Sequence, residues 1–261
     1  MAVAIAMCSI VACDRVTGDG DHSGRDGGEA LAATLNRSMQ GVPYAPRALD
    51  AIGQVRGVVQ LDGRPPADSV IQPTSDQAVC GAGHTRPGID QRGGLVSGVV
   101  VWIEGLRSGK PLPIERRFEI TSDRCVLIPE VQAVVAGGTL NVRSLDSVEH
   151  RTRIVHRETN EVLATIRETA EGQVVPNERV LARPGILELG CDVHAWTRGW
   201  IAVFDHPYFA VSGADGSFVM DSLPPGRYEV RVWHPRLRPI SDSVTVTAGQ
   251  VAQVGLKARA R

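Results

Sequence analysis

Residues 186–204 read ILELGCDVHAWTRGWIAVF, and this stretch is the clearest guide to the architecture. Residues 186–189 and 200–204 are rich in the apolar and β-branched side chains that favour strands. The short segment between them carries Cys191 and His194. The stretch therefore predicts two β-strands joined by a tight loop that holds a thiol and an imidazole.

Strand-like segments of the same kind recur on both sides of this loop, with turn signals such as Asp62-Gly63 between them. The further predicted strands are residues 55–61, 98–104, 116–121, 139–144, 152–156, 162–167, 228–234, 243–247 and 251–256. Residues 98–104 are strongly apolar, which is typical of a strand covered on both faces. No amphipathic helix longer than two turns is evident after residue 53. The sequence therefore predicts an all-β protein with Greek-key sandwich topology.

The composition fits a folded protein that does not bind nucleic acid. The chain has 261 residues, 43% of them hydrophobic and 22% charged, with 28 glycines and 16 prolines. Such proportions exclude a disordered chain and suit many short strands joined by tight turns. The formal net charge is −1, whereas a nucleic-acid-binding protein normally carries a basic excess. No apolar run reaches the roughly 18 residues of a membrane-spanning helix.

The N-terminal segment predicts export from the cytoplasm. Residues 1–12, MAVAIAMCSIVA, are uncharged and almost wholly apolar, like the core of an export signal. Their end and Cys13 resemble a bacterial lipobox, so we expect a lipid on Cys13 to anchor the chain to a membrane face; the alternative is a plain signal peptide. Residues 13–51 read as a flexible tether with a short helix within 29–40. The expected location is therefore the periplasm or cell envelope, with membrane contact only through the lipid.

The five cysteines leave one thiol without a partner. Two of them lie in or next to the N-terminal segment, and Cys80 and Cys125 would meet an oxidising compartment after export. We therefore predict a Cys80–Cys125 disulfide, with two buried free thiols as the alternative. Cys191 is then the lone thiol, which calls for an explanation.

Cys191 and His194 form a C-x-x-H loop whose thiolate and imidazole could share one metal ion. A third ligand must come from another part of the chain. His150 lies 41 residues before Cys191, just beyond a predicted strand. A sandwich could bring that position beside the loop, so His150 is the candidate third ligand. The alternative is that Cys191 is a small buried apolar residue.

Residues 214–235, ADGSFVMDSLPPGRYEVRVWHP, contain two tight turns flanked by alternating strands. This phrase resembles the carboxypeptidase regulatory-like, transthyretin-like β-sandwich module. The resemblance implies a structural or protein-contact role for the C-terminal region, and it says little about chemistry. Only about four strands follow residue 206, so we expect this module to pack on the preceding domain.

The order of the candidate ligands resembles that of the cupredoxins, which are Greek-key domains with one type 1 copper. The short C-x-x-H spacing is similar to the amicyanin-type loop, and residues 53–258 resemble cupredoxin-like proteins associated with methylamine utilisation. The resemblance implies a copper ion held by His150, Cys191 and His194. Thr197 stands where the family has an axial methionine, and Arg151 stands where an asparagine often links the ligand loops. Both departures bear on metal affinity and redox potential.

Together these observations predict a cupredoxin-like domain over residues 52–205 and a regulatory-like module over 206–261. We expect a copper-binding electron carrier without enzymatic activity, whose partner is another redox protein of the cell envelope. Two alternatives remain open: a metal-free scaffolding or adhesion protein, and a copper storage or delivery protein. The sequence contains no phosphate-binding loop, dinucleotide fingerprint, hydrolase elbow or C-x-x-C pair.

Overall fold

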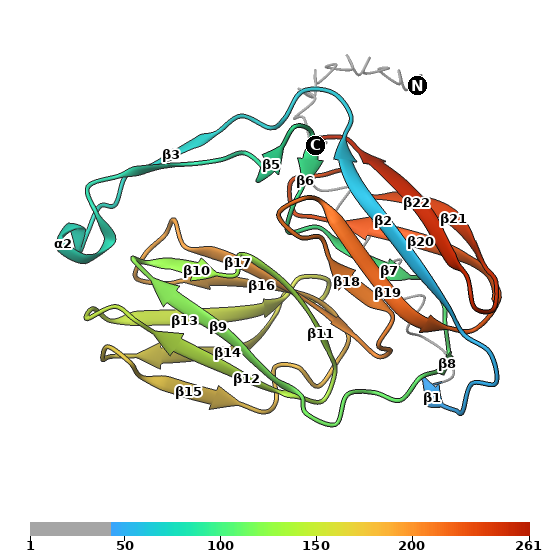
Figure 1. Cartoon of the computed structure of the whole chain (residues 1–261). Coiled ribbons are helices and arrows are strands. Elements are labelled where there is room, and N and C mark those ends of the chain that lie inside the picture. The colour runs from blue at the N-terminus through green and yellow to red at the C-terminus, as the bar shows by residue number, and fades with distance from the viewer. Residues whose placement is uncertain (1–42) are drawn as a thin grey trace, which may run out of the picture.

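The computed structural model describes residues 43–261, and within them the all-β prediction is confirmed. Strands arranged in two packed sandwiches make up this part of the chain, and the one helix described is the single turn α2 (Gln77–Cys80) (Figure 1). Among these residues no helix has the length and apolarity to cross a membrane. The predictions for residues 1–12, for lipidated Cys13 and for a helix within 29–40 lie outside the described residues.

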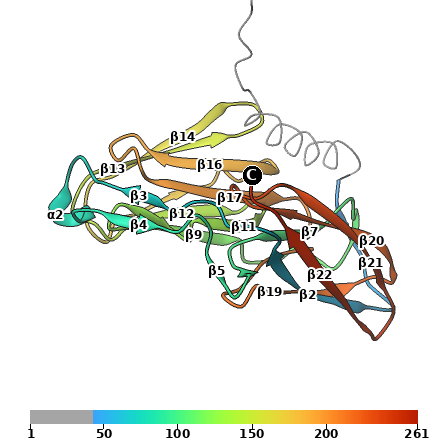
Figure 2. The same cartoon turned by 90° about the horizontal axis from the view of Figure 1, so that it is seen from above.

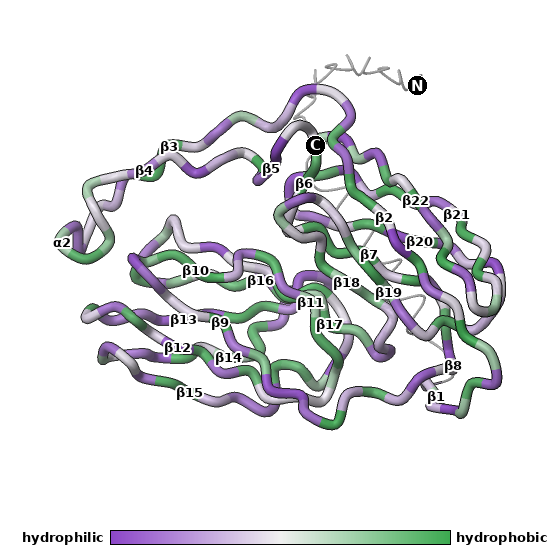
Figure 3. The backbone as a smooth tube through the Cα atoms, viewed as in Figure 1, coloured by the Kyte–Doolittle hydropathy of each residue, from purple (hydrophilic) through white to green (hydrophobic). Residues whose placement is uncertain are grey.

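The first sandwich consists of a four-stranded sheet, in the order β10-β9-β12-β15, and a five-stranded sheet, in the order β11-β17-β16-β13-β14. The strands are β9 (Arg117–Asp123), β10 (Val126–Ile128), β11 (Val131–Val135), β12 (Thr139–Ser144), β13 (His150–His156), β14 (Glu161–Glu168), β15 (Val174–Asn177), β16 (Gly185–Cys191) and β17 (Arg198–Phe204). Hydropathy alternates along β12 (Figure 3). Leu140 and Val142 are buried in the core, whereas their neighbours Asn141 and Arg143 are only partly buried. On the opposite sheet Ile154 and Leu189 complete this core.

The second sandwich pairs a sheet in the order β18-β7-β20-β21 with a sheet in the order β19-β2-β6-β5, to which β22 is added beside β2. Its strands are β2 (Gly53–Leu61), β5 (Gln91–Arg92), β6 (Leu95–Val96), β7 (Val100–Ile103), β18 (Phe209–Val211), β19 (Ser217–Leu223), β20 (Gly226–Trp233), β21 (Ile240–Val246) and β22 (Val251–Ala258). Its core includes Val55, Val59, Phe218 and Leu256, all of them nearly inaccessible to solvent.

The strand pairing does not follow the predicted domain boundary between residues 205 and 206. The prediction counts residues 52–103 with the first domain. However, β2 pairs with β19 and in parallel with β22, while β7 lies between β18 and β20. The C-terminal strands are too few to enclose a core, so the earlier segment completes their sandwich. Alternation of side chains shows which face of a strand is buried but not which strand lies beside it.

The two sandwiches meet through β7, which is buried on both faces as its apolar sequence predicts. Val101 and Ile103 face the core of the second sandwich. Val100 and Trp102 face the other way and pack with residues of the first sandwich, including Phe204, whose ring centroid lies 5.6 Å from that of Trp102. This interface fixes the two sandwiches relative to one another.

Residues 69–86 form an arm that leaves the second sandwich and reaches the end of the first (Figures 1 and 2). Two short antiparallel strands, β3 (Ser69–Ile71) and β4 (His84–Arg86), form the stem of the arm, and α2 lies at its tip. The predicted Cys80–Cys125 disulfide is present and joins the tip to the turn between β9 and β10. The arm therefore connects two strands of the second sandwich along the chain, while its tip contacts the first sandwich.

Candidate metal centre

Two neighbouring strands bring the three candidate ligands to one end of the first sandwich. His150 is the first residue of β13 and Cys191 is the last residue of β16. Because these strands are antiparallel, with Thr152 opposite Cys191, the start of one lies beside the end of the other. His194 follows in the loop between β16 and β17. The convergence that the sequence predicts for His150, Cys191 and His194 is therefore observed.

The donor atoms of the three side chains lie close together in a buried place. The Cys191 Sγ is 3.8 Å from the His150 Nδ1 and 3.7 Å from the His194 Nδ1. The two Nδ1 atoms are 3.1 Å apart. Both imidazoles are fully buried and Cys191 is 6% exposed. These atoms form a compact group of one sulfur and two nitrogens.

A carboxyl group sets the tautomer of each histidine. The His150 Nε2 lies 2.9 Å from Asp146 Oδ2, and the His194 Nε2 lies 3.1 Å from Asp76 Oδ2. A carboxylate only accepts hydrogen bonds, so each Nε2 carries a hydrogen and donates it. Burial lowers the pKa of His150, which favours the neutral ring. The lone pairs of both Nδ1 atoms therefore point into the same space.

This arrangement fits a metal ion, because two lone pairs 3.1 Å apart repel each other unless a cation or a hydrogen lies between them. The thiol of Cys191 can donate its hydrogen to only one of the two nitrogens. A metal with bonds of about 2.0 Å to nitrogen and about 2.3 Å to sulfur, in a trigonal arrangement, holds the two nitrogens about 3.5 Å apart, somewhat farther than the observed 3.1 Å. The same arrangement holds nitrogen and sulfur about 3.7 Å apart. The two observed nitrogen–sulfur distances agree with this value.

Backbone groups support the sulfur and join the two ligand segments. The Arg151 amide N–H donates to the Cys191 Sγ across 3.4 Å, and the Asp192 amide donates to the Arg151 carbonyl oxygen across 3.0 Å. An ion pair of 2.9 Å joins Arg153 to Asp192. The side chain of Arg151 turns away and pairs with Glu149. Main-chain hydrogen bonds therefore link the two ligand segments.

Thr197, at the axial position that the resemblance implies, makes a different contact in the structure. Its hydroxyl donates to the Cys125 carbonyl oxygen across 2.6 Å, and the residue is 1% exposed. Thr197 thereby ties the loop of the ligands to the turn between β9 and β10. An axial role for Thr197 stays a prediction.

Sequence analysis missed the two carboxyl groups behind the histidines. Asp146 precedes His150 by four residues, a short-range spacing that could have pointed to it. Asp76 lies 118 residues before His194 and comes from the arm, so no local pattern could have found it. Trp196 packs against His194, with their ring centroids 5.1 Å apart, and helps to cover the site.

The remaining buried histidines lie elsewhere and make structural contacts. His156, at the far end of β13, has its Nε2 3.3 Å from the Pro184 carbonyl oxygen. The Nδ1 atoms of His206 and His234 accept backbone hydrogen bonds from the residues two positions later. Burial lowers the pKa of His206 to about 4 and that of His234 to about 3, so both rings stay neutral at pH 7.

No protein-family model and no curated protein matches the chain. Among solved structures, a purple cupredoxin from Nitrosopumilus maritimus is 18% identical, covering 33% of this chain and 99% of its own, with a TM-score of 0.28. An amicyanin from Paracoccus versutus is 16% identical, covering 36% and 85%, with a TM-score of 0.29. A copper-containing nitrite reductase from Thermus scotoductus is 19% identical, covering 40% and 24%, with a TM-score of 0.30.

These likenesses are a distant similarity to cupredoxins over about a third of the chain. At such TM-scores they carry no conclusion about chemistry, and the case for the site rests on its own geometry. The likeness of residues 214–235 to the carboxypeptidase regulatory-like module stays a prediction.

Proposed function

We propose that the protein binds one copper ion and transfers single electrons. His150, Cys191 and His194 are the ligands in this proposal. The observation that carries it is the geometry of the two Nδ1 atoms, which lie 3.1 Å apart and face a buried sulfur. The Nε2 atom of each ring is hydrogen-bonded to a carboxyl group, which leaves the Nδ1 lone pair free for a metal ion. Histidine ligands in metal sites commonly donate their second nitrogen in this way.

The donor set suits copper in both of its common oxidation states. A thiolate is the soft ligand that Cu(I) favours, and imidazole also suits Cu(II). When bound, copper supplies the one-electron chemistry. The protein contributes fixed positions: His150 and Cys191 lie on paired strands, and the Arg151 amide donates to the sulfur. A scaffold that holds its ligands in place requires little rearrangement when the charge of the ion changes.

Burial of the site favours a carrier over an enzyme. None of the three ligand side chains is more than 6% exposed, so a substrate has no open approach to the donor atoms. In this proposal the electron passes to or from a second redox protein. The predicted export segment supports a partner in the cell envelope.

Copper reconstitution tests the proposal directly. Purified protein with one equivalent of Cu(II) should develop a strong thiolate-to-copper charge-transfer absorption at about 600 nm. Cys191→Ser should abolish the colour. His156→Gln is the control, because His156 is a buried histidine at the other end of β13 from His150 and its ring nitrogen lies against Pro184 instead of the site.

Two results would overturn electron transfer. Colourless copper binding that survives in Cys191→Ser would favour storage or delivery. Absence of copper binding at micromolar concentration would favour the scaffolding function.

A further inference from the structure

The arm carries one aspartate that contacts a candidate ligand. Asp76 precedes α2, and its Oδ2 accepts a hydrogen bond from the His194 Nε2 across 3.1 Å. The Asp76 side chain is 36% exposed, and among residues 43–261 no lysine or arginine forms an ion pair with it. An aspartate carboxylate carries one negative charge at pH 7. The arm therefore places a negative charge without a cationic partner on the side of the His194 ring opposite the donor Nδ1.

The backbone of the arm favours this contact over a local one. An aspartate just before a helix commonly caps it, with a side-chain oxygen that accepts a backbone N–H of the first turn. Asp76 occupies this position but makes no such hydrogen bond. Its φ of 51° lies in the left-handed region, which is unfavourable for a residue with a Cβ. The Asp76 carboxyl group thus contacts His194 although this conformation forgoes a cap and strains the backbone.

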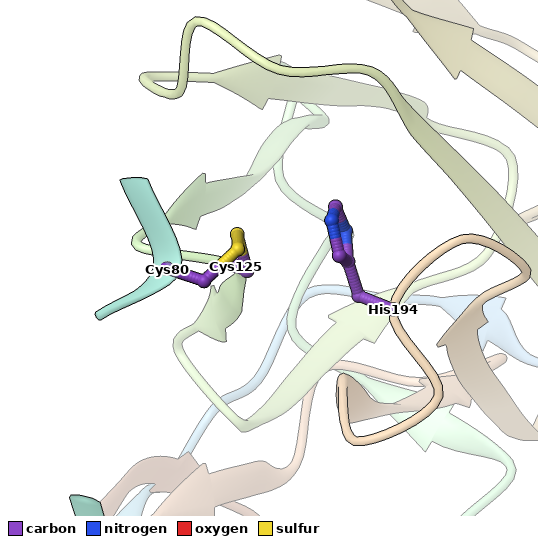
Figure 4. A group of neighbouring side chains, drawn as sticks. All are labelled: Cys80, Cys125 and His194. Carbon is purple, nitrogen blue, oxygen red and sulfur yellow. A yellow bond between two sulfur atoms is a disulfide. The ribbon is translucent and has the colours of Figure 1, made fainter. Parts of the chain in front are cut away.

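Two further contacts fix the position of Asp76. The Cys80 amide donates to the Asp76 carbonyl oxygen across 2.8 Å. Cys80 is in turn bonded to Cys125, and the sulfurs of this disulfide lie within 4.8 Å of a ring nitrogen of His194 (Figure 4). Because the disulfide fastens the tip of the arm to the turn between β9 and β10, the Asp76 carboxyl group is held against the ring.

Negative charge gathers around the candidate ligands. A Cys191 thiolate carries one negative charge, and the two imidazoles donate to the carboxyl groups of Asp146 and Asp76. The arginines that follow on β13 are already in ion pairs, Arg151 with Glu149 and Arg153 with Asp192. A negative charge attracts Cu(II) more strongly than Cu(I), because the attraction scales with the charge of the ion. Each carboxylate at the site therefore favours the oxidised ion.

We propose that Asp76 makes the centre favour Cu(II) over Cu(I), so that the arm lowers the reduction potential of the site. This proposal rests on the copper ligation proposed above, and it gives the segment that leaves the second sandwich a role in the chemistry of the first. Asp76 transfers no electron and no proton. It is a positioning residue that acts by its charge, through the His194 ring to which it is hydrogen-bonded.

The test is the pair of copper dissociation constants at pH 7, measured by competition with a Cu(I) chelator and with a Cu(II) chelator. Asp76→Asn keeps an oxygen that accepts the His194 hydrogen, and asparagine suits the left-handed backbone, so this variant removes the charge alone. For a partly exposed carboxylate one imidazole ring away, the ratio of the Cu(I) to the Cu(II) dissociation constant should fall about 3–50-fold. The midpoint potential should rise accordingly.

A structural role and a role of the charge give different results. Asp76→Ala also loses the hydrogen bond, so it should weaken the binding of both ions in addition to changing their ratio. If Asp76 only supports the structure, Asp76→Asn leaves the ratio within about twofold of the wild type, and the proposal is overturned.

Asp62→Asn is the control for a general effect of net charge. The Asp62 side chain is 44% exposed, and β2, which it follows, ends at the opposite end of the arm from α2 (Figure 1). Charges separated by more than about 10 Å are screened at moderate salt, so this variant should change the ratio less than about twofold. An equal shift in Asp62→Asn and Asp76→Asn overturns the proposal.

The tautomer of His194 provides a readout that requires no metal. Long-range nitrogen–proton spectra of the metal-free protein should show the hydrogen on Nε2 in the wild type and in Asp76→Asn, because both side chains offer an oxygen to it. A hydrogen on Nδ1 in the wild type would mean that Asp76 does not hold the ring, and the proposal fails.

The same measurements separate this proposal from the proposed function. If the protein turns blue with Cu(II) but Asp76→Asn leaves the ratio unchanged, the role of the arm is wrong and electron transfer stands. If copper binds without colour and Asp76→Asn still shifts the ratio, electron transfer fails and the role of Asp76 stands. Absence of binding of either ion overturns both.

Discussion

Replacing Asp146 should damage both the stability of the protein and its copper site, because one buried carboxyl group serves both. Asp146 is 3% exposed, and its carboxyl group accepts three hydrogen bonds. Two come from the backbone amides of Arg124 and Cys125, and the third comes from the His150 ring at 2.9 Å. The carboxyl group therefore ties the turn that carries the disulfide to a candidate metal ligand, His150.

The size of the effect follows from the donors that lose their acceptor. Asp146→Ala leaves the Cys125 amide and the His150 Nε2 buried without partners. Each unsatisfied donor costs about 1–3 kcal/mol, so we expect a loss of roughly 2–6 kcal/mol in the free energy of unfolding. Asp146→Asn can keep its oxygen on these two donors and loses only the bond to Arg124, which predicts about 1–2 kcal/mol. Loss of the contact behind a metal-binding histidine weakens metal affinity about 10–100-fold.

Urea unfolding of the metal-free protein and Cu(II) competition titrations measure the two effects separately. Asp192→Asn is the matched control: Asp192 follows a ligand directly, but its partner is the half-exposed Arg153, so its loss should cost under about 1 kcal/mol. The expected order of stability is wild type, Asp146→Asn, Asp146→Ala. If Asp146→Ala unfolds within about 1 kcal/mol of the wild type and binds copper with equal affinity, the role assigned to this carboxyl group is wrong.

Three further predictions concern stability. A Cβ at Gly57 would lie 2.3 Å from the Val254 carbonyl oxygen, so Gly57→Ala should lower the urea midpoint strongly, whereas Gly255→Ala has open space and should change it little. Burial raises the pKa of Glu168 from 4.5 to about 7. The free energy of unfolding of the wild type should therefore fall by about 3 kcal/mol as the pH rises from 4.5 to 7. Urea unfolding across this pH range should show that Glu168→Gln removes the loss. Burial lowers the pKa of His206 from 6.5 to about 4, so the contribution of this residue to the free energy of unfolding falls as the pH drops from 6.5 to 4. The expected slope is about 1.4 kcal/mol per pH unit, and His206→Gln should remove it from a series of urea unfolding curves.

The sequence predicts the ligand loop well because its information is local. The short C-x-x-H spacing places Cys191 and His194 on one turn between two strands, and alternation along the strands identifies their buried faces. His150 is a longer inference, but the antiparallel pairing of β13 with β16 makes the start of one strand meet the end of the other. The disulfide was predicted by elimination among few cysteines, which also requires no knowledge of the fold.

The sequence predicts the partners of distant segments poorly. The apolar run of β7 indicates cover on both faces, yet nothing in it shows that β18 and β20 lie beside it. The carboxyl group of Asp76 reaches His194 only because the arm crosses from one sandwich to the other. Contacts of this kind depend on the path of the whole chain, which no short pattern encodes.

The path of the chain also connects the second sandwich to the candidate metal centre of the first. Strand β2 belongs to the second sandwich, and the chain that follows it enters the arm, supplies Asp76 and Cys80 to the metal centre of the first, and returns to β5. The acidic contact behind the candidate ligand His194 and one half of the disulfide thus come from the segment that leaves the neighbouring sandwich. Because β22 pairs with β2 along its length, the C-terminal strand holds the origin of the arm in place. The region after residue 205 therefore supports the arm beside the candidate metal centre without contributing a candidate ligand to it.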